Sequence, residues 1–346
     1  MSYKTILEKL INRQNLSVEE SEEIAREIIL GNLPETIVSA ILVLLRAKRE
    51  TSEEIVGFAR ALRNSMIRVI LDKQAIDTAG TGGDGYNTIN VSTVAALLLS
   101  KVIPVAKHGN RAVSGISGSA DFLEGLGYNI LVRPEVAKEL INKCNFVFLY
   151  APLYHPAMKN VANVRKQLGI KTIFNILGPL SNPAEVKVQM SGVFSLEYAE
   201  KISEAARELD YERLLIYHGE PGIDEVSPIG NTYIFEIRKK KVEKYLVNVK
   251  EFGIEPFPIQ KVIVNSVEES IIRVLRASLG KDDEASKFIC INTAIGLYSI
   301  NKCKEFKDCY ELCNILLSEL INIIRNIINL NGDSNKLNNL LVKVNG

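Results

Sequence analysis

The feature that most constrains the fold is a change of hydrophobic pattern at about Val69. Before it, apolar residues recur only at helical spacing, and Ser/Thr-x-x-Glu capping boxes at residues 17–20 and 51–54 mark helix starts. After it, short apolar runs alternate with helical segments, as in parallel strands joined by crossover helices. The chain is therefore predicted to be α/β, with a small α-helical domain at 1–68 and a larger α/β domain at 69–346.

The pattern also predicts individual elements. Four helices are expected in the first domain, one of which ends near Gly31 and is followed by one that opens at Pro34. Short apolar runs that favour strands lie at 75–78, 104–107, 129–132, 146–150, 189–195, 213–218 and 231–237. Helices are expected from about 91, and at 119–126, 134–143, 268–279, 283–300 and 309–330. The basic run at 238–241 is interpreted as a solvated hairpin turn in preference to a polyanion site.

Composition excludes several classes of protein. Hydrophobic residues make up 47% of the 346 residues, too many for a disordered chain. Lys and Arg number 42 and Asp and Glu 41, so no global field favours nucleic acid or an anionic membrane. No apolar run approaches the roughly 18 residues of a membrane span, and the first residues form no secretory signal. Five cysteines without a CxxC pair argue against a disulfide framework, so a cytoplasmic protein is expected.

A glycine-rich stretch at residues 77–93 is the most informative motif. It reads Asp-Thr-Ala-Gly-Thr-Gly-Gly-Asp-Gly-Tyr-Asn-Thr-Ile-Asn-Val-Ser-Thr and lies between a predicted strand and a predicted helix. Its glycines let the backbone approach an anion, and free amides at a helix start favour phosphate. Asn90, Ser92 and Thr93 would add side-chain donors there. The stretch is neither a Walker A loop nor GxGxxG, and a purely structural turn remains the alternative.

A second polar stretch, at residues 107–121, follows the next predicted strand. It holds three groups that can be cationic, Lys107, His108 and Arg111, together with three serine hydroxyls, at 114, 117 and 119. In a parallel sheet its start would lie beside the first loop, at the edge where open α/β sheets bind ligands. The two stretches together favour a highly anionic substrate, whereas a solvated loop is the simpler interpretation of the second one alone.

Carboxylates and cations farther along the chain have two interpretations each. Asp224 and Glu225 are adjacent after a predicted strand and suit Mg²⁺, although such a pair is usually only exposed charge. Arg165 would either bind a substrate carboxylate bidentately or pair with a surface acid. His155 would be either a base or a histidine held by loop carbonyls, and the structural role is favoured for it and for His218.

Taken together, these motifs resemble the anthranilate phosphoribosyltransferase family, with archaeal members most similar in character. The matching segments begin at Asp77 (DTAGTGGD), Asn90 (NVST), Lys107 (KHGNR), Ser117 (SGSAD), Asn163 (NVR), Gly178 (GPLSNP) and Asp224 (DE). The combination spans nearly the whole chain and is specific, although no single motif is. Ile116 departs from the family, since some relatives carry Lys there. The resemblance also implies that the residue at position 150, here Tyr150, tunes either mobility or product release.

The resemblance implies a fold and a reaction. The fold is that of the nucleoside phosphorylases and related phosphoribosyltransferases, in which a mainly parallel central sheet with flanking helices forms the larger domain. A later helical segment near 166–186 would join the small domain, with the active site at the hinge and a homodimer through the N-terminal helices. The reaction joins anthranilate and 5-phosphoribosyl 1-pyrophosphate (PRPP) to give N-(5-phosphoribosyl)anthranilate and pyrophosphate, the second step of tryptophan biosynthesis from chorismate. Two Mg²⁺ ions per active site are implied, and neither nucleic acid nor membrane is an expected partner.

The resemblance also implies roles for individual positions. The implied catalytic residues are Asp84, Lys107 and His108, with His108 only the nearest candidate for a general base. The implied magnesium ligands are Ser92, Asp224 and Glu225. Implied contacts to anthranilate are Gly80, Asn110, His155, Arg165, Gly178 and Pro179. Implied contacts to PRPP are Gly80, Gly83, Asp84, Thr88, Asn90, Val91, Ser92, Thr93, Lys107, His108, Gly109, Asn110, Arg111, Ala112, Val113, Ser114, Gly115 and Ser119.

Two other functions are weighed against this one. A pyrimidine nucleoside phosphorylase of related fold would use free phosphate without obligatory Mg²⁺, and the Asp224–Glu225 pair and Arg165 argue against it. A non-catalytic relative that binds nucleic acid should lose the glycine-rich loop or the acidic pair and show a basic face. The retained motifs and the net charge of +1 argue against that function.

Overall fold

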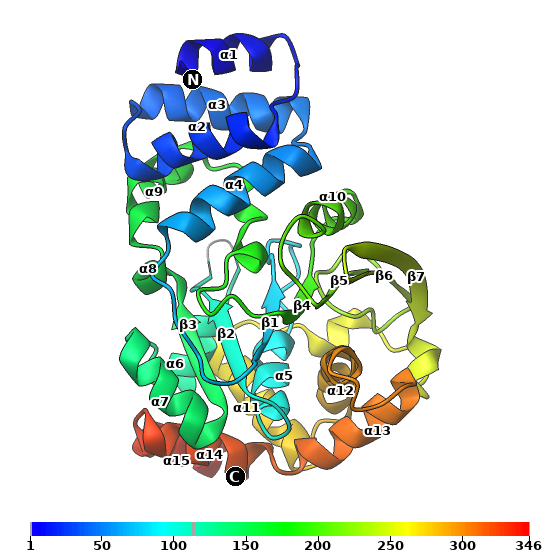
Figure 1. The fold of residues 1–346 in the computed structure, drawn as a ribbon. Helices are drawn as coiled ribbons and strands as arrows, with labels where there is room; N and C mark the ends of the chain where they lie inside the picture. Colours follow the sequence, from blue (N-terminus) through cyan, green and yellow to red (C-terminus); the bar gives the residue numbers. More distant parts are fainter. Residues whose placement is uncertain (1, 113–114, 346) are drawn as a thin grey trace.

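A bundle of four N-terminal helices lies beyond one side of a seven-stranded sheet in the computed structural model, which describes residues 2–112 and 115–345 (Figure 1). The bundle consists of α1 (Tyr3–Ile11), α2 (Val18–Leu30), α3 (Glu35–Lys48) and α4 (Ser52–Ser65). Both expected capping boxes are present, since Ser17 and Thr51 each accept a bond from the amide of the glutamate three residues later. Gly31 ends α2 in the left-handed conformation, as the sequence predicts.

The sheet has the strand order β3-β2-β1-β4-β5-β6-β7. Its first five strands are parallel, and β6 and β7 form an antiparallel hairpin at one edge. The basic run turns between those two strands, with Lys239 and Lys240 at positive φ, so the predicted hairpin turn is confirmed. The strands are β1 (Ile76–Gly80), β2 (Val105–Gly109), β3 (Phe146–Tyr150), β4 (Val188–Gly192), β5 (Arg213–Gly219), β6 (Asn231–Arg238) and β7 (Lys241–Asn248).

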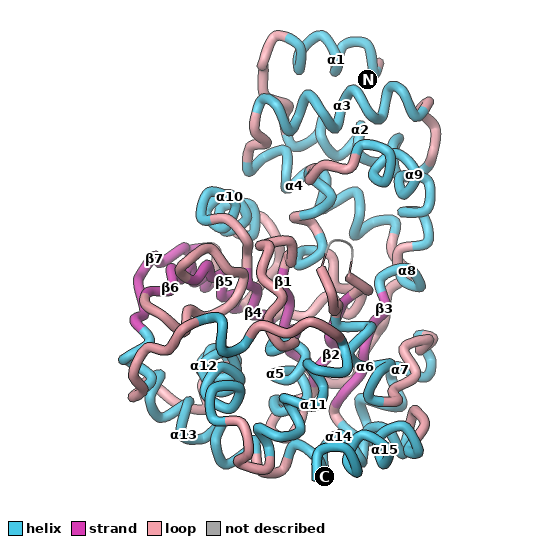
Figure 2. The backbone as a smooth tube through the Cα atoms, turned by 180° about the vertical axis from the view of Figure 1, so that it is seen from behind, coloured by secondary structure: helices cyan, strands magenta, loops and turns pink. Residues whose placement is uncertain are grey.

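Helices cover both faces of the sheet (Figure 2). α10 (Leu196–Ala206) lies on the face toward the bundle, whereas α5 (Val91–Leu99), α11 (Val267–Ser278) and α12 (Asp283–Ser299) lie on the opposite face. The remaining helices are α6 (Ser119–Leu126), α7 (Pro134–Cys144), α8 (Ala151–Tyr154), α9 (Lys159–Leu168), α13 (Phe306–Leu317), α14 (Leu320–Leu330) and α15 (Ser334–Asn345). The predicted mixture of a helical bundle and a mainly parallel sheet is therefore confirmed.

Two hydrophobic cores follow from this layering. Along β5, Leu214 and Ile216 face α10 and the bundle, whereas Leu215 and Tyr217 face α12 on the other side. This alternation is the period of two that a strand imposes on its side chains. One core joins the bundle to α9, α10 and one sheet face, and the other fills the space between the sheet and α5, α11 and α12.

Several expected elements differ in the structure. The predicted helix at 309–330 is two helices, because the chain breaks at residues 318–319 between α13 and α14. The apolar run at 129–132 forms no strand, and α15 was not predicted. Segment 166–186 is not mainly helical: after the end of α9 it contains only the short 3-10 turns Ile173–Asn175 and Gly178–Leu180.

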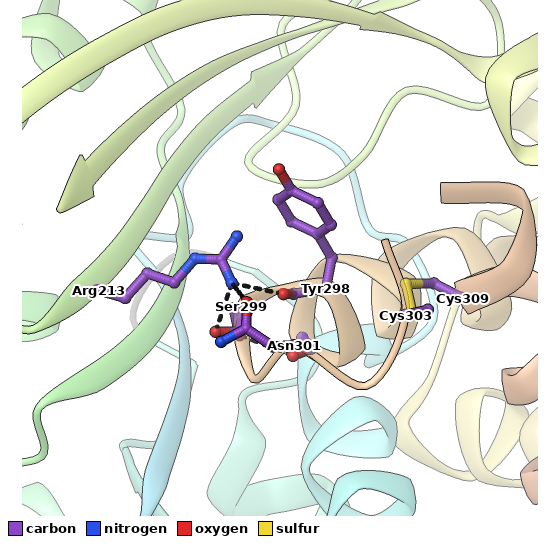
Figure 3. Close-up of a disulfide and its surroundings, with 7 residues drawn as sticks. Arg213, Tyr298, Ser299, Asn301, Cys303 and Cys309 are labelled. Carbon is purple, nitrogen blue, oxygen red and sulfur yellow. Dashed lines mark hydrogen bonds between the residues drawn. A yellow bond between two sulfur atoms is a disulfide. The ribbon is translucent and has the colours of Figure 1, made fainter. Parts of the chain in front are cut away.

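A single disulfide joins Cys303, in the connection after α12, to Cys309 of α13, although the cysteine pattern argued against a disulfide framework (Figure 3). The two Cα atoms are 5.4 Å apart, within the usual range for such a bond. Spacing alone did not indicate it, because the six-residue separation becomes a short span only when α12 ends and the chain reverses.

Arg213 stabilises the end of α12 beside that disulfide (Figure 3). Its Nη1 donates to the carbonyls of Tyr298 and Ser299 at 2.6 and 2.9 Å and to Asn301 Oδ1 at 2.8 Å. Its Nε pairs with the buried Glu236 carboxylate at 2.8 Å. Free carbonyls at a helix end attract cations, so this arginine ties β5 to the α12 terminus.

Candidate active site

The glycine-rich loop leaves the sheet at Gly80, the last residue of β1. Gly82, Gly83 and Gly85 all have positive φ, at 61°, 74° and 89°. The Thr81 hydroxyl accepts a bond of 3.0 Å from the amide of Phe194, which follows β4. The loop is thus fixed at the carboxyl edge of the parallel strands, where the sequence places an anion site.

The carboxylate loop between β5 and β6 packs directly against the glycine-rich loop. Asp224 Oδ2 accepts a 2.6 Å bond from the Gly82 amide, and the Asp224 amide donates to Asp84 Oδ2 at 3.3 Å. The Thr88 hydroxyl lies 2.8 Å from both oxygens of Glu225. The structure therefore brings together residues that lie about 140 positions apart in the sequence.

Gly192, at the end of β4, permits this approach. A Cβ atom at that position would lie 1.6 Å from the Asp224 carbonyl oxygen, which no side chain can accommodate. No sequence motif marks Gly192, because the close contact arises only from the pairing of β4 with β1 and β5.

The acidic residues of this site are costly to bury as anions. Burial and the nearby Asp84 raise the pKa of Asp224 to about 7, and burial with Asp224 raises the pKa of Glu225 well above its usual range. A divalent cation would remove this penalty. Carboxylates side by side therefore fit Mg²⁺, which takes one or two protein carboxylates and completes its shell with waters and phosphate oxygens.

Protein side chains alone do not form a complete metal cage. In the two described stretches of the chain, no group of three or more His, Cys, Asp and Glu side chains is placed to hold a metal ion.

Lys107 lies in β2, near the carboxyl end of the strand, and its buried side chain lies beside the glycine-rich loop. Its Nζ donates to the Thr78 carbonyl and lies 3.2 Å from the Thr78 hydroxyl and 3.5 Å from Ser92 Oγ. Burial lowers the pKa of Lys107 to about 8, and the Asp77 carboxylate acts in the opposite direction. The ammonium thus lies at the start of α5, beside the expected phosphate site.

The start of α5 departs in part from the sequence prediction. Asn90 does not present a free side chain, because its Oδ1 accepts bonds of 2.8 Å from the hydroxyls of Ser117 and Ser270. Val91 is buried, and Thr93 is buried with a hydroxyl that has no described partner. Ser92 is half-buried and close to Lys107, so it is the better placed of the predicted donors.

The second predicted loop, after β2, is organised by Asp121. Its Oδ2 accepts from the amides of Ala112 and Gly118 at 2.8 and 2.9 Å. Arg111 pairs with Asp121 and Glu124, so its charge is already compensated in this conformation. Further predicted members lie along the same loop, at Gly109, Asn110, Gly115 and Ser119. Val113 and Ser114 lie outside the described residues.

The residues expected to contact anthranilate lie where the bundle approaches the sheet. The rings of His108 and His155 are 5.1 Å apart, and they bond to the carbonyls of Gly178 and Ser181 at 3.3 and 3.0 Å. Burial lowers their pKa values to about 3 and about 4. Both imidazoles are therefore neutral near pH 7, which supports the structural role favoured for His155.

Arg165 differs from the other cations near the site. It projects from α9, with its guanidinium 6.0 Å from the centre of the Phe174 ring, and burial lowers its pKa. It forms no salt bridge with any residue in 2–112 or 115–345. Two further residues expected to contact anthranilate differ in burial: Gly178 is exposed with open space where a Cβ would lie, whereas Pro179 is buried.

Three polar residues near the site were missed as functional candidates. Asp77 accepts a 3.2 Å bond from the His108 amide and a 2.8 Å bond from Asn182, which also donates to the Ala106 carbonyl. Lys171 donates to the Gly83 carbonyl. Asp77 and Asn182 stand in the quoted motifs, but nothing in the sequence places Lys171 against the glycine-rich loop.

Comparison with known proteins identifies the family. Residues 4–66 match the glycosyl transferase family helical bundle domain, and residues 72–319 match the glycosyl transferase family a/b domain. Anthranilate phosphoribosyltransferase of Saccharolobus solfataricus is 56% identical over the full length of both chains. The chain belongs to the anthranilate phosphoribosyltransferase family. The enzyme of Sulfurisphaera tokodaii is 51% identical over 99% of this chain and all of its own length.

Solved structures of the same family share the fold. Anthranilate phosphoribosyltransferase of Thermus thermophilus superposes with a TM-score of 0.87 and 33% identity over 94% of this chain and 98% of its own. The Saccharomyces cerevisiae enzyme in complex with PRPP and Mg gives a TM-score of 0.86 and 29% identity over 95% of this chain and 97% of its own. No helix in the described parts of the chain is long and apolar enough to cross a membrane.

Proposed function

We propose that this chain transfers the 5-phosphoribosyl group of PRPP to the amine of anthranilate, giving N-(5-phosphoribosyl)anthranilate and pyrophosphate. This is the second step of tryptophan biosynthesis from chorismate. The observation that carries the proposal is the packing of the Asp224–Glu225 loop on the glycine-rich loop, with Lys107 beside them. Full-length identity of 56% to a named enzyme of this activity supports it.

The diphosphate would lie between the glycine-rich loop and the start of α5. In the reaction the bond from ribose C1 to the diphosphate oxygen breaks, and the electron pair leaves with pyrophosphate. Backbone amides of the loop, Lys107 and Ser92 would stabilise the charge that develops on this leaving group. Asp84 would fix the loop geometry, since its two oxygens accept from the Tyr86 and Asp224 amides.

Anthranilate would lie between Arg165 and the end of β2. Arg165 has no ionic partner among the described residues, and a guanidinium binds a planar carboxylate bidentately. The amine forms its bond to ribose C1 and loses a proton as the product forms. Because an aromatic amine is a weak nucleophile, positioning carries much of the rate. The low pKa of His108 makes it a hydrogen-bonding group of the site and a poor proton acceptor.

Magnesium is part of the proposal. The structure of a relative contains PRPP and Mg, and a bound cation would stabilise the buried Asp224 carboxylate, whose pKa burial and Asp84 raise to about 7. We assign Ser92, Asp224 and Glu225 as the protein groups that hold magnesium, with two ions per site. When bound, the metal neutralises diphosphate charge.

The assembly belongs to the proposal as well. We divide the chain into domains at 1–68 and 69–346, with residues 166–186 joined to the helical domain, because Ile173, Phe174 and Leu177 pack in the bundle core. We extend the proposal to a homodimer through these helices, on which the apolar side chains of Ile11 and Val43 are exposed. Light scattering should give twice the chain mass. A cytoplasmic location completes the proposal.

A substrate panel tests the reaction. Purified protein with PRPP, anthranilate and Mg²⁺ should consume the fluorescence of anthranilate and release pyrophosphate, whereas thymidine with phosphate should give no thymine. Phosphorolysis of thymidine without activity on anthranilate would instead support a nucleoside phosphorylase. Binding of duplex DNA that weakens with salt, with neither activity, would support the nucleic-acid-binding alternative.

A further inference from the structure

Lys171 connects the helical part of the molecule to the glycine-rich loop. It follows Gly169, which ends α9 at φ 61°, and precedes a 3-10 turn that packs in the bundle core. Its ammonium donates to the Gly83 carbonyl. The half-buried side chain of Lys171 therefore extends from a segment that packs with the helical bundle to the glycine-rich loop of the α/β domain.

The position of the ammonium is fixed on a second side. Nζ lies 3.6 Å from the centre of the Phe194 ring, a cation–π contact. Phe194 is itself tied to the loop, because its amide donates to the Thr81 hydroxyl. An ammonium has three donors, of which the Gly83 bond uses one, so donors remain for a ligand.

The charge of Lys171 acts on the carboxylates of the site. Burial lowers the pKa of Lys171, whereas the negative charges of Asp84 and Asp224 oppose that effect and Arg46 adds to it. Asp84 and Asp224 themselves accept their hydrogen bonds from backbone amides. Lys171 is thus a tethered cation at the end of the site where a metal and a diphosphate would meet.

These contacts lead to one inference, which rests on the proposed function. We propose that Lys171 is a positioning residue for the diphosphate group of PRPP. Its ammonium donates to the Gly83 carbonyl. Its positive charge weakens the binding of a metal ion alone, by electrostatic repulsion. The same charge strengthens the binding of a metal ion together with diphosphate, because that complex carries net negative charge. Free metal and Lys171 compete for the same negative charge, whereas the diphosphate adds negative charge that satisfies both.

The test compares Lys171→Met and Lys171→Arg with wild type. In steady-state assays, Lys171→Met should raise KM for PRPP about tenfold or more, the size expected for a lost charge-assisted bond, and change KM for anthranilate by less than about threefold. In titrations of Mn²⁺ alone, without substrate, Lys171→Met should bind the metal about threefold or more tightly than wild type. Lys171→Arg retains the charge and should restore both values to near wild type.

A matched control is Lys166→Met. Lys166 is exposed in the last turn of α9, the helix that precedes Lys171 in the chain. Removing its charge should change neither KM for PRPP nor the affinity for Mn²⁺. If Lys171→Met binds Mn²⁺ and PRPP as wild type does, the inference is wrong. It is equally wrong if the variant loses thermal stability and weakens both substrates alike without a change in Mn²⁺ affinity, since that pattern describes a structural tether. Inactive wild type would instead contradict the proposed function, and the Mn²⁺ titration would still decide the charge effect.

Discussion

Close backbone approaches, more than side-chain identity, set the geometry of this site at the scale of single residues. The carboxylate loop reaches the glycine-rich loop only because Gly192 has no side chain between them. The side chain of Asp77, near the start of β1, accepts from the His108 amide of β2 and from Asn182. Substitution of Gly192 tests the close backbone approach, and substitution of Asp77 tests the side-chain hydrogen bonds and charge.

Gly192→Ala should displace the Asp224 loop, since the new Cβ would lie 1.6 Å from the Asp224 carbonyl oxygen. We expect kcat/KM for PRPP to fall by about 100-fold or more, as when a transition-state charge stabiliser is lost. Steady-state kinetics at saturating Mg²⁺ measure this. Ser191→Ala on the same strand is the control, because it removes a buried hydroxyl without a described partner and should leave kcat/KM nearly unchanged. Equal activity of the two variants would contradict the assigned contact.

Asp77→Asn should move the pH dependence of the reaction. The pKa of Lys107 is about 8 and is supported by the Asp77 carboxylate, whose own pKa of about 6, raised by burial, leaves it ionised above pH 6. Lys107 loses its charge as pH rises through its pKa, so kcat/KM for PRPP should fall above about pH 8 in wild type.

Without the Asp77 charge the pKa of Lys107 falls further. The alkaline limb of the pH profile, where kcat/KM for PRPP falls as pH rises, should therefore shift to lower pH. Asn182→Ala, which removes a hydrogen bond to Asp77 without removing its charge, should leave the limb close to that of wild type. A limb that stays in place or moves upward in Asp77→Asn would show that this pair does not set the charge of Lys107.

At the scale of elements, one buried carboxylate organises the helical bundle. Glu54 accepts from the amides of Leu16 and Thr51 at 3.0 and 2.9 Å and from Lys48 Nζ at 2.8 Å. It therefore joins the connection before α2, the start of α4 and the end of α3. The capping box alone predicts only the bond to Thr51, because the partners from elsewhere depend on tertiary packing.

Glu54→Gln should accordingly destabilise the protein by about 3 kcal/mol, since it leaves a buried Lys48 without its anion. Glu20→Gln, in the more exposed capping box of α2, should cost only about 1 kcal/mol. Urea unfolding followed by circular dichroism measures both. Similar losses in the two variants would contradict the role given to Glu54.

The sequence predicted elements best where a local signal was complete. The predicted helix at 119–126 and strand at 146–150 coincide with α6 and β3, since the first has apolar residues at helical spacing and the second is a continuous apolar run. It failed where tertiary contacts decide: the break between α13 and α14 carries no Gly or Pro, and Asn90 turns to Ser117 and Ser270 instead of toward a ligand. The site motifs were recognisable, but the partners of Asp224, Gly192 and Lys171 come from strands and loops far away in the chain.

At the scale of the whole molecule, the sheet and the helices beneath it are also joined away from the active site. There Arg213 of β5 bonds to the end of α12, and a disulfide joins the α12–α13 connection to α13. Reducing the Cys303–Cys309 bond, or replacing both cysteines by Ser, should lower stability by about 2 kcal/mol, the chain-entropy value for so short a loop. Thermal unfolding with and without reductant measures this. Thiol titration of the unfolded protein should find Cys144, Cys290 and Cys313 free. Titration of all five cysteines would contradict the disulfide.

In the proposed function, the Asp224–Glu225 loop and the glycine-rich loop together form one metal-and-diphosphate site. Loss of anthranilate fluorescence in the presence of PRPP, with and without Mg²⁺, tests it most directly. The matched control for Asp224→Asn with Glu225→Gln is Asp210→Asn with Glu212→Gln, on the exposed connection before β5. Wild type and control should consume anthranilate only with Mg²⁺, whereas the site variant, folded by circular dichroism, should be slower by about 100-fold or more. Undiminished Mg²⁺-dependent activity in the site variant would contradict the claim.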